Sequence, residues 1–273
     1  MEYKLIALDL DGTTASRNRI SKQNIAAIKW ALANDIKVII ATGRSIGAIR
    51  KVAKKLGIIE KQMPVVGFNG GIIYDFAKEK IIQQNAFTNE ELITVFNIAN
   101  EYRIQLWAYS VANDHLAYVN TNRGFMVKWM SIHTKRKRIL VKNSNTLHDQ
   151  AYKFVVSGKK ENVLKFKAKI LVKYEFNVFD SSYLMNQSLN LEISPKNSDK
   201  KDALEYVTKI YNIQPSEVIA MGDSSNDYEM LKWAGLGIAM GNAKNHIKDI
   251  SDDVTAHYRR SGVAKAINKY FKK

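Results

Sequence analysis

Two aspartates follow the first apolar segment of the chain and could carry out metal-assisted chemistry. Asp9 and Asp11 come directly after apolar residues 5–8, and Gly12 and Thr13 come next. An apolar run rich in Leu and Ile is typical of a buried strand, and a Gly-Thr pair is typical of the turn that ends it. Ligands bind at the carboxyl ends of strands in open parallel sheets. Because two carboxylates at one strand end repel each other, the pattern indicates a divalent cation, and oxygen ligands favour Mg²⁺.

Two further segments carry groups that can hold a phosphoryl group. Thr42 and Gly43 follow apolar residues 38–41, and a hydroxyl and backbone N–H groups at such a turn suit phosphate oxygens. Lys200 stands at the beginning of an expected helix, where its ammonium group could reduce the repulsion between a carboxylate nucleophile and a phosphoryl group. Taken alone, the first segment also fits a capping threonine with a turn glycine, and the second fits a surface lysine.

A second acidic segment completes the set. Asp223 and Asp227 follow apolar residues 218–221 and offer further cation ligands, although an acidic turn that caps the next helix would look the same. A carboxylate can attack phosphorus and form an aspartyl-phosphate, while a second carboxylate protonates the leaving oxygen and then activates water. The order of the four segments, and their common place at element ends, favours phosphoryl transfer.

The elements that position these residues alternate between strands and helices at both ends of the chain. The middle of the chain is richer in strands, with two expected helices and a hairpin. Ser21 and Ser45 are expected to cap helices, and Gly57 is expected to end the second one. Expected strands cover residues 4–8, 37–41, 64–67, 72–74, 80–83, 105–110, 115–119, 138–141, 151–157, 174–180, 190–193, 218–221 and 236–240. Expected helices cover residues 21–32, 45–56, 89–102, 162–172, 199–210, 227–234 and 262–271.

This order predicts an α/β protein with a doubly wound parallel-sheet core and an inserted α+β domain. Residues 1–83 and 189–273 are expected to form the core, and residues 84–188 the insertion. The aromatic residues of the insertion could stack on a ring of a substrate, but their spacing favours ordinary packing. These residues are Trp107, Tyr109, Phe125, Trp129 and Tyr183.

Composition narrows the class of protein. The chain has 273 residues, no cysteine and a formal net charge of +16. Disulfides, thiolate catalysis and cysteine-based zinc sites are therefore excluded, and anionic partners are favoured. We expect no signal peptide and no membrane span, and hence a cytoplasmic protein. The densest basic run, residues 135–138, is expected to be a solvated face or loop rather than a nucleic-acid site. The sequence does not indicate an oligomeric state.

At this point the chain resembles the haloacid dehalogenase-like (HAD) hydrolase superfamily, and within it the Cof-type phosphatases with a large α/β cap of type IIB. The resemblance covers the whole chain. The matching segments are Asp9-Leu10-Asp11-Gly12-Thr13, Ala41-Thr42-Gly43-Arg44, Phe68-Asn69-Gly70-Gly71, Lys200, Gly222-Asp223-Ser224-Ser225-Asn226-Asp227 and Gly237-Ile238-Ala239-Met240-Gly241-Asn242-Ala243.

The resemblance implies a role for each catalytic residue. Asp9 would be the nucleophile and a Mg²⁺ ligand. Asp11 would be the general acid/base and would bind Mg²⁺ through its backbone carbonyl. Thr42 and Lys200 would hold the phosphoryl group, and Asp223 would bind Mg²⁺.

The remaining matched residues would support these groups. Asp227 would orient Lys200 or a metal-bound water. Asn226 and Asn242 would lie close to the phosphate. Three residues would lie near the substrate entrance: Gly43, Arg44 and Asn69. The insertion would cover the site and choose the leaving group.

Three positions depart from the family pattern. Thr14 stands where an apolar residue is usual, and Lys201 stands where a glycine usually follows the motif lysine. Arg260-Ser261 replaces the usual acidic pair before Gly262. None of these departures removes a chemical group that the reaction needs.

The leading hypothesis is therefore a Mg²⁺-dependent phosphatase that acts on small phosphorylated metabolites such as sugar phosphates, FMN or pyridoxal phosphate. One alternative is a phosphomannomutase-like phosphotransferase, which would pass the phosphoryl group to a sugar hydroxyl instead of water. Another is a basic nucleic-acid-binding protein on a HAD scaffold, for which the net charge and the basic run are the motivation.

Overall fold

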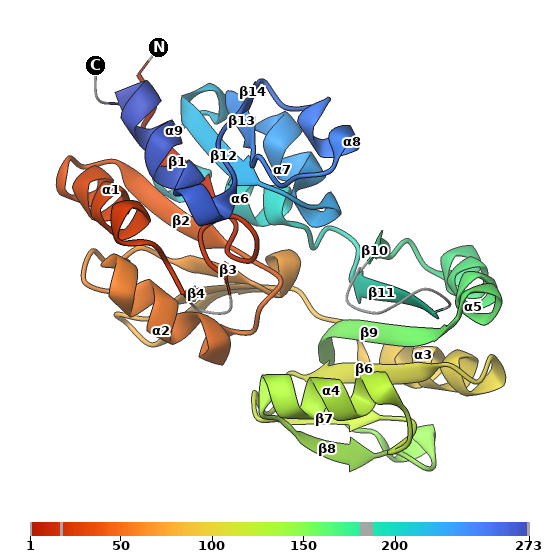
Figure 1. The fold of residues 1–273 in the computed structure, drawn as a ribbon. Helices are drawn as coiled ribbons and strands as arrows, with labels where there is room; N and C mark the ends of the chain where they lie inside the picture. The colour runs from red at the N-terminus through yellow and green to blue at the C-terminus, as the bar shows by residue number, and fades with distance from the viewer. Residues whose placement is uncertain (1, 17–18, 181–187, 272–273) are drawn as a thin grey trace. The chain divides into compact units, whose positions relative to one another are not determined.

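The computed structural model describes residues 2–16, 19–180 and 188–271. The chain divides into two compact units, coloured by position along the chain in Figure 1. The core unit comprises residues 1–84 and 199–273, and the inserted unit comprises residues 85–198. Each unit has its own sheet and its own cluster of buried apolar side chains.

The core unit is built on an eight-stranded sheet with the order β14-β13-β12-β1-β2-β3-β4-β5. Neighbours from β14 to β3 are parallel, and β3-β4-β5 form antiparallel hairpins. The central strands are buried on both faces, as their unbroken apolar sequences predict. The strands are β1 (Leu5–Leu8), β2 (Lys37–Ala41), β3 (Val65–Gly67), β4 (Ile72–Asp75), β5 (Lys80–Gln84), β12 (Val218–Gly222), β13 (Leu236–Ala239) and β14 (Asp253–Val254).

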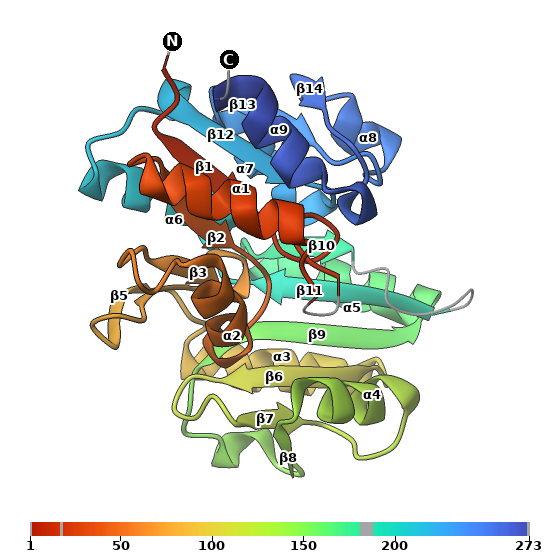
Figure 2. The same cartoon turned by 60° about the vertical axis from the view of Figure 1, so that its left-hand side comes forward.

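Helices cover both faces of this sheet, which makes the core unit doubly wound. In Figure 2, α1 and α9 lie on the near face and α6 and α7 on the far face. The helices are α1 (Lys22–Ala33), α2 (Ile46–Leu56), α6 (Lys200–Ile210), α7 (Tyr228–Trp233), α8 (Asn245–Lys248) and α9 (Gly262–Phe271). Short 3₁₀ turns are η1 (Phe68–Gly70), η3 (Pro215–Glu217), η4 (Ser225–Asp227) and η5 (Tyr258–Arg260).

The ends of the first two helices follow local rules. The Ser21 hydroxyl accepts a hydrogen bond from the Asn24 N–H and caps α1. Gly57 ends α2 in the left-handed conformation, at φ 83°. Ser45 stands at the N-cap of α2 but makes no side-chain cap hydrogen bond, so only its position agrees with the prediction.

The inserted unit has a six-stranded sheet with the order β10-β11-β9-β6-β7-β8. All neighbours are antiparallel except β7 and β8. Helices α3 and α5 pack on one face through a core that includes Phe96, Phe154 and Phe166. The strands are β6 (Gln105–Ser110), β7 (Leu116–Val119), β8 (Lys137–Leu140), β9 (Ala151–Lys159), β10 (Asn177–Asp180) and β11 (Ser188–Ser194). The helices are α3 (Asn89–Glu101), α4 (Phe125–Thr134), α5 (Lys160–Lys173) and the 3₁₀ turn η2 (Ser144–Thr146).

The structure differs from the sequence prediction in three places within the inserted unit. Residues 189–198, which the sequence assigns to the core, lie in the inserted unit because β11 pairs with β9 and β10. Helix α4 is not predicted from the sequence. The first residue of α4, Phe125, is 65% exposed, although the sequence predicts that it packs in the core. Tyr183, to which the same prediction applies, lies outside the described residues.

The basic run 135–138 is not a uniformly solvated segment. Arg136 is buried at 6% exposure, and its guanidinium pairs with Asp114 and lies over the ring of Tyr109. Burial of an arginine requires such partners, and a single sequence does not reveal them. Among the described residues, no helix combines the length and apolarity needed to cross a bilayer.

Candidate active site

A buried lysine lies between two carboxylates at the carboxyl edge of the core sheet. Asp9 follows β1, Lys200 begins α6, and Asp227 ends η4. The Lys200 ammonium nitrogen lies 2.6 Å from Asp9 Oδ1 and 2.6 Å from Asp227 Oδ1. Lys200 and Asp227 are fully buried, and Asp9 is 4% exposed. Because a buried charge is costly unless paired, these three groups depend on one another.

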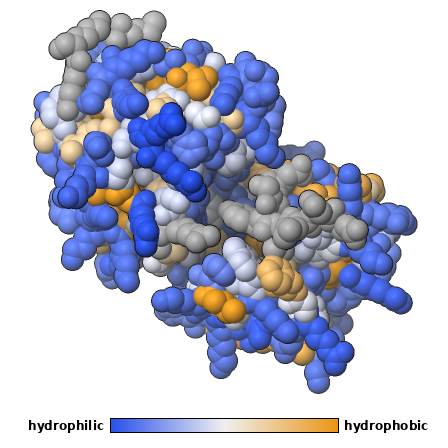
Figure 3. Space-filling model, in the orientation of Figure 1, coloured by the Kyte–Doolittle hydropathy of each residue, from blue (hydrophilic) through white to orange (hydrophobic). Residues whose placement is uncertain are grey.

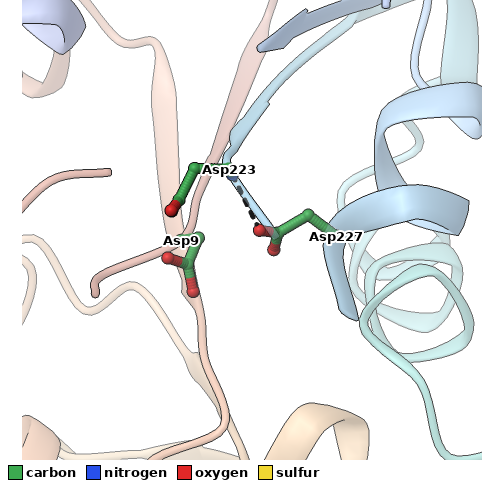
Figure 4. A group of neighbouring side chains, drawn as sticks. All are labelled: Asp9, Asp223 and Asp227. Carbon is green, nitrogen blue, oxygen red and sulfur yellow. Dashed lines mark hydrogen bonds between the residues drawn. The ribbon is translucent and has the colours of Figure 1, made fainter. Parts of the chain in front are cut away.

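Asp223 extends this acidic group from the end of β12. Single oxygens of Asp9, Asp223 and Asp227 lie within 4.8 Å of one another. Figure 4 shows the three carboxylates turned toward a common centre, with the hydrogen bond from the Asp223 N–H to Asp227 Oδ2 dashed. Three carboxylates thus face one ammonium group, which leaves an excess of negative charge for a cation to balance.

The contacts of the three carboxylates separate their possible roles. Asp227 Oδ1 accepts from Lys200, and Asp227 Oδ2 accepts from the backbone N–H groups of Asp223 and Ser224. Asp9 Oδ2, in contrast, is buried without a hydrogen-bond partner. Mg²⁺ is usually held by one or two protein carboxylates together with water, and an unpartnered buried carboxylate oxygen next to a second carboxylate fits that arrangement. Asp9 therefore has a free oxygen for a cation, with the carboxylate of Asp223 beside it, whereas the oxygens of Asp227 accept from Lys200 and from the backbone.

Asp223 is held in place by two hydrogen bonds. The Thr13 hydroxyl donates to Asp223 Oδ1 at 2.9 Å, and the Asn242 amide donates to Asp223 Oδ2 at 3.1 Å and to the Gly12 carbonyl at 2.9 Å. Gly12 has φ +87°, and a Cβ atom there would overlap the Asp223 carboxylate. The position therefore requires glycine on both grounds.

Burial sets the electrostatics of the group. It raises the pKa of Asp9 well above its usual value, with Lys200 opposing and Asp227 and Asp223 adding to the rise. Burial, together with the Asp227 carboxylate, raises the pKa of Asp223 to about 6. Burial alone would lower the pKa of Lys200, but the carboxylates of Asp227 and Asp9 outweigh it and raise the pKa. Lys200 is therefore a permanent cation, while the two acids favour a proton or a metal ion.

Asp11 lies apart from this cluster. Its side chain is 46% exposed and forms a bidentate pair with Arg44, at 2.6 Å from Nε to Oδ2 and 2.5 Å from Nη2 to Oδ1. The two residues come from the ends of β1 and β2, which are adjacent in the sheet. Arg44 thus contacts the residue expected to act as general acid/base, a contact that the sequence does not predict.

The remaining matched residues gather at the ends of β2 and β3. Thr42 is buried, and its backbone is fixed by hydrogen bonds with Val66 and Asn69. Gly43 lies against Asn69, where a Cβ atom would come within 2.7 Å of the Asn69 amide oxygen. Asn226 donates to that same oxygen at 2.9 Å, which joins the β2 edge to η4.

Two threonines contribute contacts that the motifs alone do not reveal. Besides Thr13, the hydroxyl of Thr14 donates to the backbone carbonyl of Asp9 at 2.7 Å. Thr14 is buried at a position where the family usually has an apolar side chain. Its hydroxyl is therefore satisfied locally and supports the backbone of Asp9. The position of Thr14 next to the motif is the only sequence signal for this contact.

Comparison with known proteins agrees with this geometry. The family model of the haloacid dehalogenase-like hydrolases matches residues 6–267. The 5-amino-6-(5-phospho-D-ribitylamino)uracil phosphatase YcsE of Bacillus subtilis is 28% identical over 271 residues, which cover 99% of this chain and 96% of that protein. A haloacid dehalogenase-like hydrolase from Bacteroides thetaiotaomicron has a crystal structure that matches with a TM-score of 0.83 and 27% identity, covering 99% of this chain and 100% of that one.

A second solved structure shares the fold at lower identity. A sugar phosphatase of HAD subclass IIB matches with a TM-score of 0.80 and 22% identity, and the match covers 98% of each chain. The family match spans both units and all the residues of the site. The chain therefore belongs to the haloacid dehalogenase-like hydrolases, within the Cof-type group of phosphoric monoester hydrolases.

Proposed function

We propose that this enzyme is a Mg²⁺-dependent phosphatase that hydrolyses small phosphorylated metabolites through an aspartyl-phosphate on Asp9. One observation carries the proposal. The ammonium group of the buried Lys200 lies 2.6 Å from Asp9, and Asp223 lies near enough to Asp9 for the two carboxylates to share a cation. The substrate panel that tests the proposal includes sugar phosphates, FMN and pyridoxal phosphate.

Mg²⁺, when bound, would neutralise charge on the phosphoryl oxygens and on the attacking carboxylate. Asp9 and Asp223 would hold it through their carboxylates, and Asp11 through its backbone carbonyl. Asp227, engaged with Lys200 and two backbone N–H groups, would keep the ammonium group in position. This assignment makes Asp227 a positioning residue.

The covalent steps then follow from the residues present. The Asp9 carboxylate attacks phosphorus, the bond from phosphorus to the ester oxygen breaks, and the Asp11 carboxyl group donates a proton to that oxygen. Lys200 and Thr42 stabilise the negative charge of the transferring group. In the second half, Asp11 takes a proton from water, and the oxygen of that water attacks the aspartyl-phosphate. Inorganic phosphate leaves and Asp9 is restored.

The Asp11–Arg44 pair adds one requirement. Both oxygens of the Asp11 carboxylate contact Arg44 in the structure. Because both oxygens contact the guanidinium, the pair must open before the Asp11 carboxyl group can reach the leaving oxygen. We propose that substrate binding draws Arg44 toward the phosphoryl group and releases Asp11.

Phosphate release is the direct test. The experiment compares a panel of phosphorylated metabolites and p-nitrophenyl phosphate, with Mg²⁺ and with EDTA, for the wild type and Asp9→Asn. Asp35→Asn is a matched control because Asp35 is exposed and its φ of 59° suits asparagine. We expect release that requires both Mg²⁺ and Asp9, with the control unaffected.

The same panel separates the alternatives. Retention of near-wild-type turnover in Asp9→Asn would contradict the proposal. Conversion of a hexose bisphosphate to a phosphate isomer, instead of free phosphate, would identify a phosphotransferase. For the nucleic-acid alternative, the run 135–138 offers fewer basic groups than its sequence suggests, because Arg136 is buried against Asp114.

A further inference from the structure

A basic pocket of about 640 Å³ lies in the core unit beside the acidic cluster. Its described lining residues are Ser16, Arg19, Tyr258 and Arg259. They come from two segments: the turn that follows Asp9-Leu10-Asp11-Gly12-Thr13, and η5 before α9. Figure 3 shows strongly hydrophilic side chains gathered over the beginning of α9.

Hydrogen bonds connect this pocket to the site. The Tyr258 N–H donates to Asn242 Oδ1 at 3.1 Å, and the Asn242 amide donates to Asp223 Oδ2 at 3.1 Å. On the other side, residues 10–15 form a tight turn in which the Gly12 N–H donates to the Ala15 carbonyl. The backbone of Tyr258, which lines the pocket, is therefore connected to the Asp223 carboxylate through the side chain of Asn242 alone. One small substrate could thus reach both the pocket and the acidic cluster.

The described residues do not balance the charge of the pocket. Among the described residues, no carboxylate lies within ion-pair distance of Arg19 or Arg259, and both arginines are exposed. The Arg259 Nε donates to the Tyr258 hydroxyl at 3.0 Å, which leaves its other N–H groups available. Ser16 and Arg259 both hydrogen-bond to the Tyr258 hydroxyl and lower its pKa. The side chains of Ser16, Tyr258 and Arg259 are therefore already organised around one another.

The segment before α9 is basic. Residues 257–261 read His-Tyr-Arg-Arg-Ser and contain no carboxylate, whereas the family pattern has an acidic pair at Arg260-Ser261. This departure lies outside the described lining of the pocket, so the positive charge of the pocket itself comes from Arg19 and Arg259. Two arginines beside a hydroxyl form a set of donors that matches a phosphate or a carboxylate in charge and geometry.

We propose that Arg19, Tyr258 and Arg259 form a second anion subsite, which selects phosphate esters that carry a further phosphate or carboxylate group. The inference rests on the proposed function, because the first phosphate must bind at Asp9. The second anion would occupy the basic pocket while the reacting phosphate lies at the acidic cluster. The two uncompensated arginines also raise the local concentration of anionic substrates.

Substrate pairs that differ in one anionic group test the subsite. The pairs are hexose bisphosphate with hexose monophosphate, and phosphoglycerate with glycerol phosphate. The measured quantity is the ratio of kcat/KM within each pair. The first pair reports a second phosphate and the second pair reports a carboxylate, so together they identify which anion the pocket takes.

Arg259→Gln is the main variant, with Arg19→Gln beside it. Arg260→Gln is the matched control, because Arg260 is exposed in the same turn and is not among the described lining residues. We expect Arg259→Gln to lower the ratio for at least one pair by about tenfold, the order expected for one charge-assisted hydrogen bond. Arg260→Gln should leave the ratios at the wild-type values. Equal effects of Arg259→Gln and Arg260→Gln, or a wild type without preference for the doubly anionic member of either pair, would overturn the inference.

A binding measurement separates this inference from the proposed function. Hexose bisphosphate and phosphoglycerate are titrated calorimetrically into Asp9→Asn and into Asp9→Asn/Arg259→Gln in the presence of Mg²⁺. Weaker binding of either compound to the second variant supports the subsite even if the wild type releases no phosphate, which would refute only the proposed function. Hydrolysis by the wild type together with equal binding by the two variants would refute only the subsite.

Discussion

Each unit of this protein buries a lysine, and the two lysines are held in different ways. Lys200 begins a helix and pairs with two carboxylates at the edge of the core sheet. Lys153 lies in the middle of β9 and pairs with Glu192 of the neighbouring strand at 3.0 Å, with exposed side-chain fractions of 4% and 15%. The first lysine belongs to a cluster with excess negative charge, and the second belongs to a balanced pair. Only the cluster around Lys200 has negative charge left for a further cation to balance, so we assign the catalytic residues to the core unit alone.

The largest expected effect comes from removing each lysine in turn. Lys200→Met leaves the buried carboxylates of Asp9 and Asp227 without the cation that pairs with them, and we expect about 3–5 kcal/mol lower stability in the metal-free protein. Turnover should fall by about 10³-fold or more because the transferring group loses its cation. Lys153→Met should cost less, about 1–3 kcal/mol, since Glu192 is partly exposed.

Urea unfolding and p-nitrophenyl phosphate turnover measure both variants. Because Lys153 lies outside the acidic cluster, we expect Lys153→Met to retain most of the wild-type turnover at a temperature where the variant is folded. Loss of turnover in both folded variants would show that the contrast between the two lysines is wrong.

Two Asp–Arg pairs provide a second contrast. Asp11 pairs with Arg44 in the core unit, and Asp114 pairs with Arg136 in the inserted unit. Asp11→Asn should lower kcat by about 10²–10⁴-fold, the usual contribution of a general acid/base. It should change stability by less than about 1 kcal/mol, because the Asp11 side chain is exposed.

Asp114→Asn is the matched variant. It leaves the buried Arg136 without its carboxylate and should cost about 1–3 kcal/mol of stability without a matching loss of kcat. Steady-state kinetics and urea unfolding compare the two variants. If Asp114→Asn lowered kcat as strongly as Asp11→Asn, the pairs would not differ in function.

The pH dependence of stability tests whether the acidic cluster of the core unit carries unbalanced negative charge. Burial raises the pKa of Asp223 in the folded state to about 6, above its ordinary value of 3.8, so the folded state binds an extra proton between these values. The contribution of Asp223 to the free energy of unfolding is therefore greatest below about pH 4, and it is lost as the pH rises through about 6. Asp223→Asn should make the metal-free protein more stable than wild type by about 1–2 kcal/mol at about pH 7.5.

This difference should shrink as the pH falls toward 4, and added Mg²⁺ should reverse it by stabilising only the wild type. Urea unfolding with EDTA or Mg²⁺ over this pH range measures it. A Mg²⁺ effect of equal size in both proteins would exclude Asp223 as a ligand.

The smallest expected effect concerns helix caps. Thr88 and Glu91 form a capping box at α3, with hydrogen bonds of 3.2 Å and 2.8 Å. Thr88→Ala should cost about 1 kcal/mol, and Ser45→Ala, at a cap without a side-chain hydrogen bond, should cost less than about 0.5 kcal/mol. Thermal unfolding compares them, and a larger loss for Ser45→Ala would contradict the reported cap geometry.

The sequence predicts the core unit well because its signals are local. The central strands of the core sheet, β1, β2, β12 and β13, are short apolar runs, and the motifs at Asp9, Thr42 and Asp223 stand where three of these runs end. The order of strands and helices therefore indicates the doubly wound sheet, which the structure confirms. The structure also brings Asp9, Asp223 and Lys200 together, as their common place at element ends suggests.

The contacts that the sequence does not predict depend on residues distant in the chain. Arg44 turns toward Asp11 because β1 and β2 are adjacent, and Arg136 is buried because Asp114 and Tyr109 lie beside it. Helix α4 escapes prediction because its N-cap, Gly124, has no side chain to cap the helix, and because its first turn lacks acidic residues. The boundary near residue 189 shifts because β11 completes the sheet of the inserted unit, a pairing that strand patterns alone do not reveal.

The central claim is that Asp9 carries the phosphoryl group during turnover. Rapid mixing with a substrate and Mg²⁺, followed by acid quenching and peptide mass spectrometry, tests it directly. We predict a transient phosphoryl group on the peptide that contains Asp9, present in the wild type and absent from Asp9→Asn. A phosphoryl group on another residue, or its presence in Asp9→Asn with turnover retained, would contradict the account.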